Sequence, residues 1–345
     1  MFHDMEIEEV LELRNKKDLV FIDVRSPSEF KNATIPGSIN IPLFDDAERA
    51  EVGTIYTQES VQLAKQRGLE IASAKLPAFV QSFHEIEAEK VVFCWRGGMR
   101  SKTSSTVLDL MGIHTYRIKG GFRAYRRYVV DALEHFHLEP PAYVVNGFTG
   151  SGKTIILRKL LSEGYPVLDF EGMANHRGSI FGQIGLTPHN QKSFDSLLFE
   201  TLLPLQQAPY VLMEAESQRV GKVVLPHFIM EKKEQGKELF IELPTKERVR
   251  NILEDYRPWE YQQQCIDVFQ KIKSRIHTPI AAQIQADLLA GDFASAVELL
   301  LENYYDPRYE YTIKQYPENR RIHIQAQNTE EAFLKVREIL QKQHV

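Results

Sequence analysis

Cysteines and long apolar runs are both scarce in this sequence. Only Cys94 and Cys265 occur among its 345 residues, so neither a disulfide framework nor a cysteine zinc site can be built from them. No apolar run reaches the roughly 18 residues that a membrane helix needs. The opening MFHDMEIEEV carries acids where a signal peptide would carry Lys or Arg. These absences predict a cytoplasmic protein without a membrane segment.

The sequence also lacks an excess of positive charge. Its formal net charge is −5, so the surface as a whole does not attract nucleic acid, and any RNA contact must use a local basic patch. Hydrophobic residues are 43% and charged residues 26%, which is typical of globular chains. The length suits two domains rather than one, and no internal repeat or low-complexity tract is present.

Short apolar strands alternate with amphipathic helices over residues 1–136. Such alternation predicts a parallel sheet with helices on both faces. The strands are expected at 20–24, 38–42, 91–95 and 115–118, and the helices at 6–16, 58–68, 76–87, 101–111 and 122–136.

Two prolines within HLEPP (137–141) interrupt the helical pattern, and a new strand follows at 143–147. We therefore predict a domain over 1–136, a linker at 137–141 and a second α/β domain over 142–345, whose last part is mostly helical. Its further strands are expected at 167–170, 210–216, 238–243 and 321–325, and its helices from 153 and at 189–203, 223–233, 245–256, 259–276, 279–289, 293–304 and 329–342.

The segment GFTGSGKT (147–154) fits the phosphate-loop pattern G-x-x-x-x-G-K-[ST], between a predicted strand and a predicted helix. A plain helix cap needs neither the full pattern nor this context, so a phosphate site is favoured. The backbone N–H groups cradle phosphate, Lys153 neutralises its charge, and the Thr154 hydroxyl can bind Mg²⁺. The expected phosphate-binding residues are Gly147, Gly150, Ser151, Gly152, Lys153 and Thr154.

Acidic residues end the strands beside this loop. A phosphate loop usually has such an acid near its Mg²⁺, and Asp169, Glu214 and Glu216 are candidates. We select Glu214, with Thr154, as the metal site, although a solvated strand end explains each acid equally well. His176 and Arg177 follow the 167–170 strand, where loops line the ligand crevice of parallel sheets. A plain surface loop is the equal alternative for them.

Cys94 closes an apolar strand and precedes a loop rich in glycine and arginine. Loop amides, a helix N-terminus and two cations all stabilise a thiolate and an oxyanion beside it. This setting favours a reactive thiol over an inert buried cysteine, whereas Cys265, within YQQQCIDVFQ, is expected to be a packing residue. The loop residues are Arg96, Gly97, Gly98 and Arg100.

The segments IDVRSPSEFKNATIPGSINIP (22–42), CWRGGMRS (94–101) and GGFRAYR (120–126) resemble the rhodanese domain. That resemblance covers about residues 1–136 and implies a cysteine that carries sulfur as a persulfide. The stretch 44–75 is longer than in a minimal rhodanese domain. The spacing from Cys94 to Arg100 is also that of the cysteine-phosphatase loop, which leaves phosphoryl chemistry open.

Further segments at 48–58, 168–182, 214–221 and 304–309, together with both loops, resemble the tRNA 2-selenouridine synthase family along nearly the whole chain. The resemblance implies an enzyme that replaces sulfur by selenium in wobble 2-thiouridine of tRNA. It implies an S-geranyl intermediate, with geranyl diphosphate and selenophosphate as co-substrates and Cys94 as selenium carrier. The phosphate loop would hold geranyl diphosphate, a nucleotide or both, with Mg²⁺ as a further candidate.

Basic and aromatic residues interleave near the end of the first domain. The mixture suits RNA phosphates and stacked bases, but an amphipathic helix with a solvated basic face explains it slightly better. The candidate RNA contacts are Arg117, Lys119, Arg123, Arg126 and Arg127, among Tyr116, Phe122, Tyr125 and Tyr128.

Two other functions stay open from the sequence. One is a cysteine phosphatase or phosphotransferase, for which Asp23 is the available general acid. The other is a non-catalytic adaptor that is regulated by a nucleotide.

Overall fold

The computed structural model describes residues 2–308 and 317–342, so Tyr309 of the segment 304–309 lies outside the described residues. The chain divides into two compact units. The first comprises Met1–His135 with Asp195–Phe199, and the second comprises Phe136–Phe194 with Glu200–Val345. In the described parts, no helix combines the length and apolar character needed to cross a membrane.

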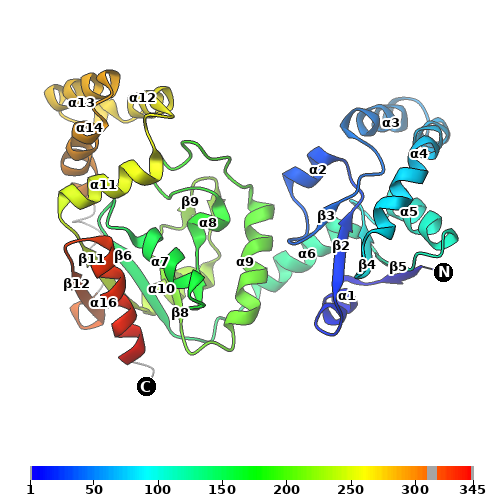
Figure 1. The fold of residues 1–345 in the computed structure, drawn as a ribbon, viewed down its shortest axis with the longest axis horizontal. Helices are drawn as coiled ribbons and strands as arrows, with labels where there is room; N and C mark the ends of the chain where they lie inside the picture. Colours follow the sequence, from blue (N-terminus) through cyan, green and yellow to red (C-terminus); the bar gives the residue numbers. More distant parts are fainter. Residues whose placement is uncertain (1, 309–316, 343–345) are drawn as a thin grey trace. The chain divides into compact units, whose positions relative to one another are not determined.

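The first unit is built on a parallel sheet, as the alternation predicted. Its strand order is β1-β5-β4-β2-β3, and every neighbouring pair is parallel. The strands are β1 (His3–Met5), β2 (Leu19–Asp23), β3 (Ile39–Asn40), β4 (Glu89–Phe93) and β5 (Thr115–Ile118) (Figure 1).

The helices of this unit depart from the prediction at residues 27–32, where a short helix was not predicted, and between residues 44 and 87. Helix α3 (Asp46–Gln58) was not predicted, and α4 (Val61–His84) is one helix rather than two. Gly68 is buried within α4, and a Cβ there would lie 3.4 Å from the Phe44 ring, which is an ordinary packing distance. The other helices are α1 (Ile7–Arg14), α2 (Pro27–Asn32), α5 (Met99–Leu110) and α6 (Gly121–Glu134).

The second unit has its own parallel sheet, with strand order β12-β11-β6-β8-β7. Helices α7 (Lys153–Ser162) and α16 (Thr329–Lys342) share an apolar core with it. The strands are β6 (Ala142–Gly147), β7 (Val167–Leu168), β8 (Val211–Glu214), β11 (Lys237–Glu242) and β12 (Arg321–Gln325), and the other helices around them are α8 (Phe170–Ala174), α9 (Gln191–Leu205), α10 (His227–Gln235) and α11 (Thr245–Tyr256).

Two short elements in this unit differ from expectation. Helix α8 begins directly after β7, because the Asp169 side chain caps it by accepting from Gly172 N. The segment expected to begin a helix at 223 instead forms a hairpin of β9 (Arg219–Val220) and β10 (Val223–Val224). Its turn contains Gly221 at φ +59°, and such a conformation ends a helical pattern.

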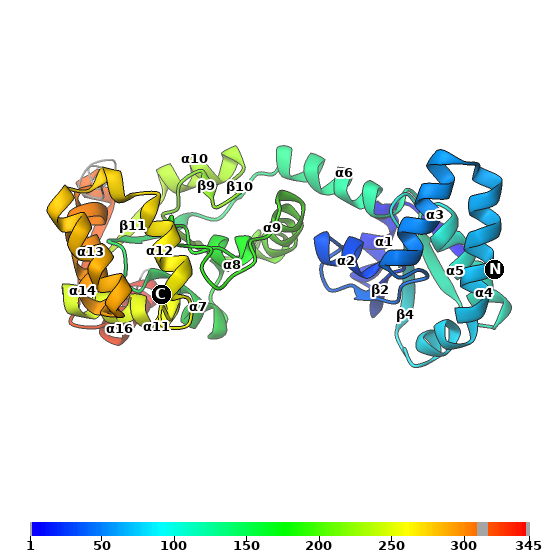
Figure 2. The same ribbon diagram turned by 90° about the horizontal axis from the view of Figure 1, so that it is seen from above.

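The predicted helical part follows α11. Helices α12 (Gln262–Gln270), α13 (Thr278–Ala290) and α14 (Phe293–Leu300) group together in both ribbon views (Figures 1 and 2). The helix predicted over 259–276 is shorter, with a 3₁₀ turn at Lys273–Arg275, and a π-helix follows α14 at Leu301–Tyr305. Ile184, from the loop before α9, packs into the core of this part.

A close backbone contact fixes the cysteine loop of the first unit. The amide of Phe122 donates to the carbonyl of Cys94 at 2.8 Å, and Arg123 N donates to Trp95 O at 2.9 Å. A Cβ on Gly121 would lie 2.1 Å from the carbonyl oxygen of Cys94. Gly121 is therefore required by this contact as well as by its φ of +57°.

We expect Gly121→Ala to destabilise the protein more than Gly112→Ala. Gly112 also has positive φ, +77°, but its Cβ would meet nothing within 4 Å. The control should lose about 1–2 kcal/mol of unfolding free energy from backbone strain, and Gly121→Ala about 1–3 kcal/mol more from overpacking. Urea unfolding measures both values, and equal losses would contradict the close contact.

Candidate functional site

The phosphate loop has the conformation that its sequence requires. It begins where β6 ends at Gly147, and α7 starts at Lys153. Gly150 has φ +79°, and a Cβ there would lie 2.7 Å from the carbonyl oxygen of Arg248. Lys153 Nζ donates to the carbonyls of Gly147 (2.8 Å) and Phe148 (3.1 Å). The ammonium group therefore folds back over the loop that should cradle phosphate.

Two buried side chains of α11 hold this loop, and sequence reasoning missed both. Arg248 Nε donates to Thr149 O at 2.8 Å, and its guanidinium pairs with Asp306. Asn251 Nδ2 donates to Gly150 O at 2.9 Å. The predicted helix at 245–256 carried no motif that would have singled them out.

One cavity of about 350 Å³ lies directly over the loop. Cationic, acidic and aromatic side chains surround this cavity, which we call the phosphate cavity. The mixture suits a ligand with a charged group and a second part that the other side chains contact. Besides loop residues 149–154, its walls include Arg158, Glu171, Arg177, Ser179, Glu216, Ile252, Tyr256, Tyr305 and Arg308.

Glu171, rather than Glu214, is the acid that forms a hydrogen bond with Thr154. The Thr154 hydroxyl donates to Glu171 Oε2 at 2.8 Å. Glu214 is 1% exposed and accepts from the backbone N–H of Glu171 at 3.1 Å, while its Oε1 has no partner in the described chain. Sequence reasoning missed Glu171 because it lies in the unpredicted helix α8.

The donor atoms at Thr154 fit Mg²⁺ in the way that phosphate loops hold it. Mg²⁺ there takes one or two protein oxygens and completes its shell with substrate phosphates and water. No group of three His, Cys, Asp or Glu residues within 2–308 and 317–342 is arranged to hold a metal alone. Thr154, with Glu171 or Glu214, would supply the protein oxygens, and the predicted Mg²⁺ site stays a prediction.

The carboxylates near the loop repel one another. Burial, and then the charge of Glu216, raise the pKa of Glu171 to about 7. Burial and the neighbouring acids raise the pKa of Glu214 well above its usual value. The folded protein therefore binds more protons than the unfolded chain between about pH 4.5 and 7, so these groups lower its stability as pH rises through that range.

His176 and Arg177 are adjacent in sequence but line different cavities. Arg177 lines the phosphate cavity, pairs with Asp255 at 2.9 Å and lies over the Tyr256 ring at 4.6 Å. His176 is buried and lines a second, polar cavity. The predicted ligand loop therefore reaches two compartments.

An apolar cavity adjoins the phosphate cavity in the same unit. The two share Thr149, Ser179, Ile252, Tyr256 and Tyr305. The helical part supplies the remaining apolar wall, chiefly Leu288, Phe293, Val297, Leu300 and Leu301. Cys265 also contributes, and burial raises the pKa of its thiol to about 11, which leaves it a packing residue.

In the first unit, Cys94 directly follows β4 and is 3% exposed. Its Sγ donates to Ser101 Oγ at 3.2 Å, in the first turn of α5. Gly97 has φ +62°, which the turn of the loop requires, and Arg96 is exposed. The structure thus brings the cysteine, the glycines and a helix N-terminus together, and it adds Ser101.

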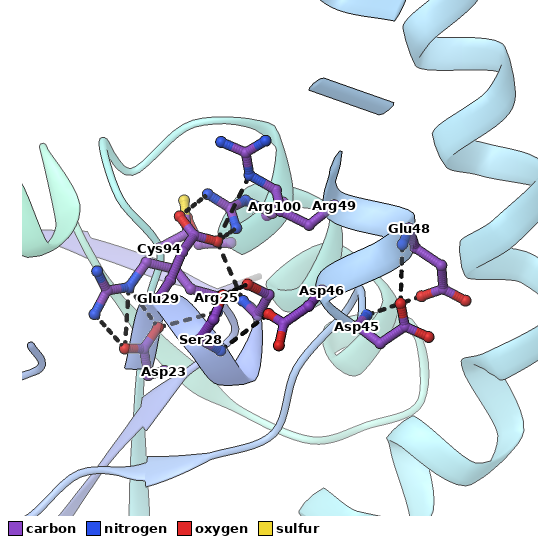
Figure 3. Close-up of polar contacts among 12 residues, drawn as sticks. Asp23, Arg25, Ser28, Glu29, Asp45, Asp46, Glu48, Arg49, Cys94 and Arg100 are labelled. Atoms are coloured by element: carbon purple, nitrogen blue, oxygen red, sulfur yellow. Dashed lines mark hydrogen bonds and ion pairs between the residues drawn. The ribbon is translucent and has the colours of Figure 1, made fainter. Parts of the chain in front are cut away.

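Arg100 is held by a partner that the sequence did not indicate. Its guanidinium pairs with both carboxylate oxygens of Glu29, with contacts of 2.5 and 3.1 Å. Burial alone would raise the pKa of Glu29, but the Arg100 hydrogen bond and charge outweigh it, and the pKa is lowered. Figure 3 shows this pair together with Cys94 and the pair of Asp23 and Arg25.

Asp23 is not available as the general acid of a phosphatase. It is fully buried, and its Oδ2 accepts from Arg25 at 2.6 Å and from Thr34 at 2.9 Å. Its Oδ1 accepts from Arg25 as well. A carboxylate with both oxygens engaged in this way supports the fold, so the structure does not favour phosphatase chemistry.

The candidate RNA contacts separate into buried and exposed groups. Arg117 is 9% exposed and pairs with Asp4, and it donates to Gly97 O at 2.5 Å. It therefore supports the cysteine loop. Phe122 and Tyr125 are fully buried, as the amphipathic-helix interpretation predicts. Of the basic residues, Arg126 is half-buried, and Lys119, Arg123 and Arg127 are exposed.

The fold and the two loops define a rhodanese-like domain joined to a P-loop domain. Residues 6–128 match the family model of the rhodanese-like domain. Residues 140–286 match a model described as the tRNA 2-selenouridine synthase AAA domain.

Relatives with this name match most of the chain. The chain is 32% identical to the tRNA 2-selenouridine synthase of Nitrosomonas europaea, over 85% of this chain and 78% of that protein. It is 30% identical to that of Sulfurovum sp., over 91% of this chain and 94% of that protein. The chain belongs to the tRNA 2-selenouridine synthase family.

We expect anion binding in the phosphate cavity to weaken as pH rises through 7, because Glu171 ionises near that pH. Sulfate is a suitable probe since its charge is constant there. Without Mg²⁺, its Kd should rise by about tenfold between about pH 6 and 8, which corresponds to about 1.4 kcal/mol of repulsion. Glu171→Gln should remove most of this change. A Kd equally pH-dependent in both proteins, measured by calorimetry, would show that Glu171 does not act on the bound anion.

Proposed function

We propose that the protein is a tRNA-modifying transferase that replaces sulfur by selenium in wobble 2-thiouridine. The reaction proceeds through S-geranyl-2-thiouridine, with geranyl diphosphate and selenophosphate as co-substrates and Cys94 as selenium carrier. Membership of the tRNA 2-selenouridine synthase family supports the substrate. The cytoplasm, where tRNA and a supply of selenophosphate occur together, is the proposed location.

The observation that carries the proposal is the junction of the phosphate and apolar cavities. A prenyl diphosphate has an anionic head and a hydrocarbon chain, and the two cavities share lining residues, so one ligand would place its head in the first and direct its chain toward the second. A nucleotide would place a polar ribose and base against Leu300 and Leu301, which gives no hydrogen bonds. The apolar cavity encloses about 60 Å³, so side chains such as Tyr305 must turn to admit a whole geranyl chain.

The roles of the loop residues follow from this placement. Loop amides and Lys153 hold the diphosphate and stabilise it as it leaves. Mg²⁺ at Thr154 would add positive charge to the same oxygens. The thiouridine sulfur then attacks the first geranyl carbon, the carbon–oxygen bond breaks with its electrons going to diphosphate, and the uracil N3 proton is lost.

Alkylation prepares the sulfur to leave. Hydrolysis of selenophosphate breaks its phosphorus–selenium bond and releases hydrogen selenide, which the loop around Cys94 would hold. Its selenium attacks C2 of the base, its proton passes to N3, and the carbon–sulfur bond breaks with its electrons going to geranyl thiolate. We assign selenium delivery to Cys94, whose thiol donates to Ser101 in the first turn of α5 and whose loop carries Arg96 and Arg100. The amides of Gly97 and Gly98 and these cations suit the negative charge that selenium brings to the loop.

We expect the two loops to fail at different steps. Cys94→Ser should still form S-geranyl-2-thiouridine tRNA but little selenouridine, so the intermediate accumulates. Lys153→Ala should leave thiouridine unalkylated, and it should regain selenation when supplied with geranylated tRNA and selenophosphate. Nucleoside mass spectrometry measures all three species.

Lys159→Ala is the matched control, because Lys159 lies on the same helix α7 and pairs with Glu330 at the surface. It should behave as the parent protein does. Full selenouridine formation by Cys94→Ser would mean that selenophosphate reacts directly, without the Cys94 carrier. Loss of both products in both variants would mean that the two steps share one inseparable site.

A further inference from the structure

A polar cavity of about 360 Å³ lies against the loop that also walls the phosphate cavity. Gly178, Ser179 and Ile180 line both. The other walls of this third cavity are His176, Gln183, Pro188, Arg219, Gly221 and Lys222. It belongs to none of the steps described above.

Ser179 marks the point where three cavities meet. It lines the phosphate, apolar and polar cavities, and its hydroxyl is 2.9 Å from the Tyr256 hydroxyl. A prenyl diphosphate that spans the first two cavities has its reactive carbon where head and chain join. That carbon would then lie near Ser179, so the third cavity is placed to hold the attacking group.

The His176 ring is enclosed by two glycines. A Cβ on Gly182 would lie 2.7 Å from its Cε1, and a Cβ on Gly221 would lie 2.7 Å from its Cδ2. His176 is 8% exposed, and its Nδ1 is sealed from solvent with no hydrogen-bond partner in the described residues. A ligand in the cavity can therefore meet only Nε2, in a ring that packing holds in place.

Burial and a neighbouring cation favour the neutral imidazole. Burial, and then the charge of Arg177, lower the pKa of His176. Arg219 and Lys222, exposed on the β9–β10 hairpin, line the same cavity. The carboxylates of Glu171 and Glu216 lie behind Gly178, within 2.8 Å of where its Cβ would be. A neutral imidazole at neutral pH can accept a proton.

We propose that the third cavity binds the pyrimidine nucleotide to be alkylated, and that His176 accepts its N3 proton as the sulfur attacks. The inference rests on the proposed function and names the acceptor site within it. The carbon–sulfur bond forms, the carbon–oxygen bond to diphosphate breaks, and the N3 proton moves to His176 Nε2. The N3 electrons form the C2=N3 double bond while the C2=S bond becomes single. Arg219 and Lys222 contact the phosphates that flank the nucleotide.

His176→Gln and His176→Ala test the proton transfer, with single-turnover formation of S-geranyl-2-thiouridine tRNA as the measurement. Both variants should lose about 10²- to 10⁴-fold in rate at saturating substrates and keep the parent's Kd for geranyl diphosphate. Added imidazole should restore part of the rate of His176→Ala, in proportion to its neutral fraction. Thermal melting checks that each variant is folded.

Arg219→Ala and Lys222→Ala test the binding site independently of the ring. Each should raise the KM for tRNA several-fold, a larger effect than the one on the rate of alkylation at saturating tRNA. Lys271→Ala and Arg275→Ala are matched controls, because these exposed cations lie in the helical part and line neither the phosphate nor the polar cavity.

The outcomes separate this inference from the proposed function. If the parent protein forms no geranylated product, the proposed function is wrong. If the parent forms it and a folded His176→Gln matches its rate, His176 is not the proton acceptor. If both hairpin variants match their controls in KM, the nucleotide does not bind in this cavity.

Discussion

Both candidate sites depend on backbone segments that approach one another more closely than a Cβ would allow. Gly121 lies against the carbonyl of Cys94, and Gly150 lies against the carbonyl of Arg248. These contacts fix the two loops from behind, since the neighbouring segments belong to α6 and α11. The reactive or ligand-binding groups of each loop can then face one side, because packing holds the loop backbone on the other side.

From the phosphate loop, one chain of contacts leads to the rest of the second unit's site. Thr154 bonds to Glu171, α8 ends at Ala174, and the segment that follows brings His176 and Ser179 to the cavities. The raised pKa of Glu171 shows that this arrangement has an electrostatic cost. A bound cation or a shared proton offsets that cost. Buried acids can therefore lie beside an anion site without making the protein unstable.

The sequence predicted what depends on local pattern. The spacing of apolar residues and the positions of glycine and proline were enough to predict both parallel sheets. The elements at 115–118, 245–256, 321–325 and 329–342 coincide with their predicted bounds. Contacts between distant residues had no such signal. Glu29 lies 71 residues from Arg100, and Arg248 lies 99 residues from Thr149. The sequence made Arg117 a candidate for RNA contact, because nothing in it indicated that Arg117 pairs with Asp4 on the neighbouring strand β1. Cavities shared between helices and loops likewise arise only in the folded chain.

We expect one prenyl diphosphate to occupy the phosphate and apolar cavities together. Calorimetric titration with geranyl diphosphate and inorganic diphosphate tests it most directly in the parent protein, Val297→Phe and Leu289→Phe. Val297 lines the apolar cavity, whereas Leu289 is 60% exposed and does not. The account predicts that geranyl diphosphate binds at least about tenfold more tightly than diphosphate, an advantage of about 1.4 kcal/mol. Val297→Phe should lose that advantage and Leu289→Phe should keep it. Equal affinity for the two ligands in the parent protein would contradict the account.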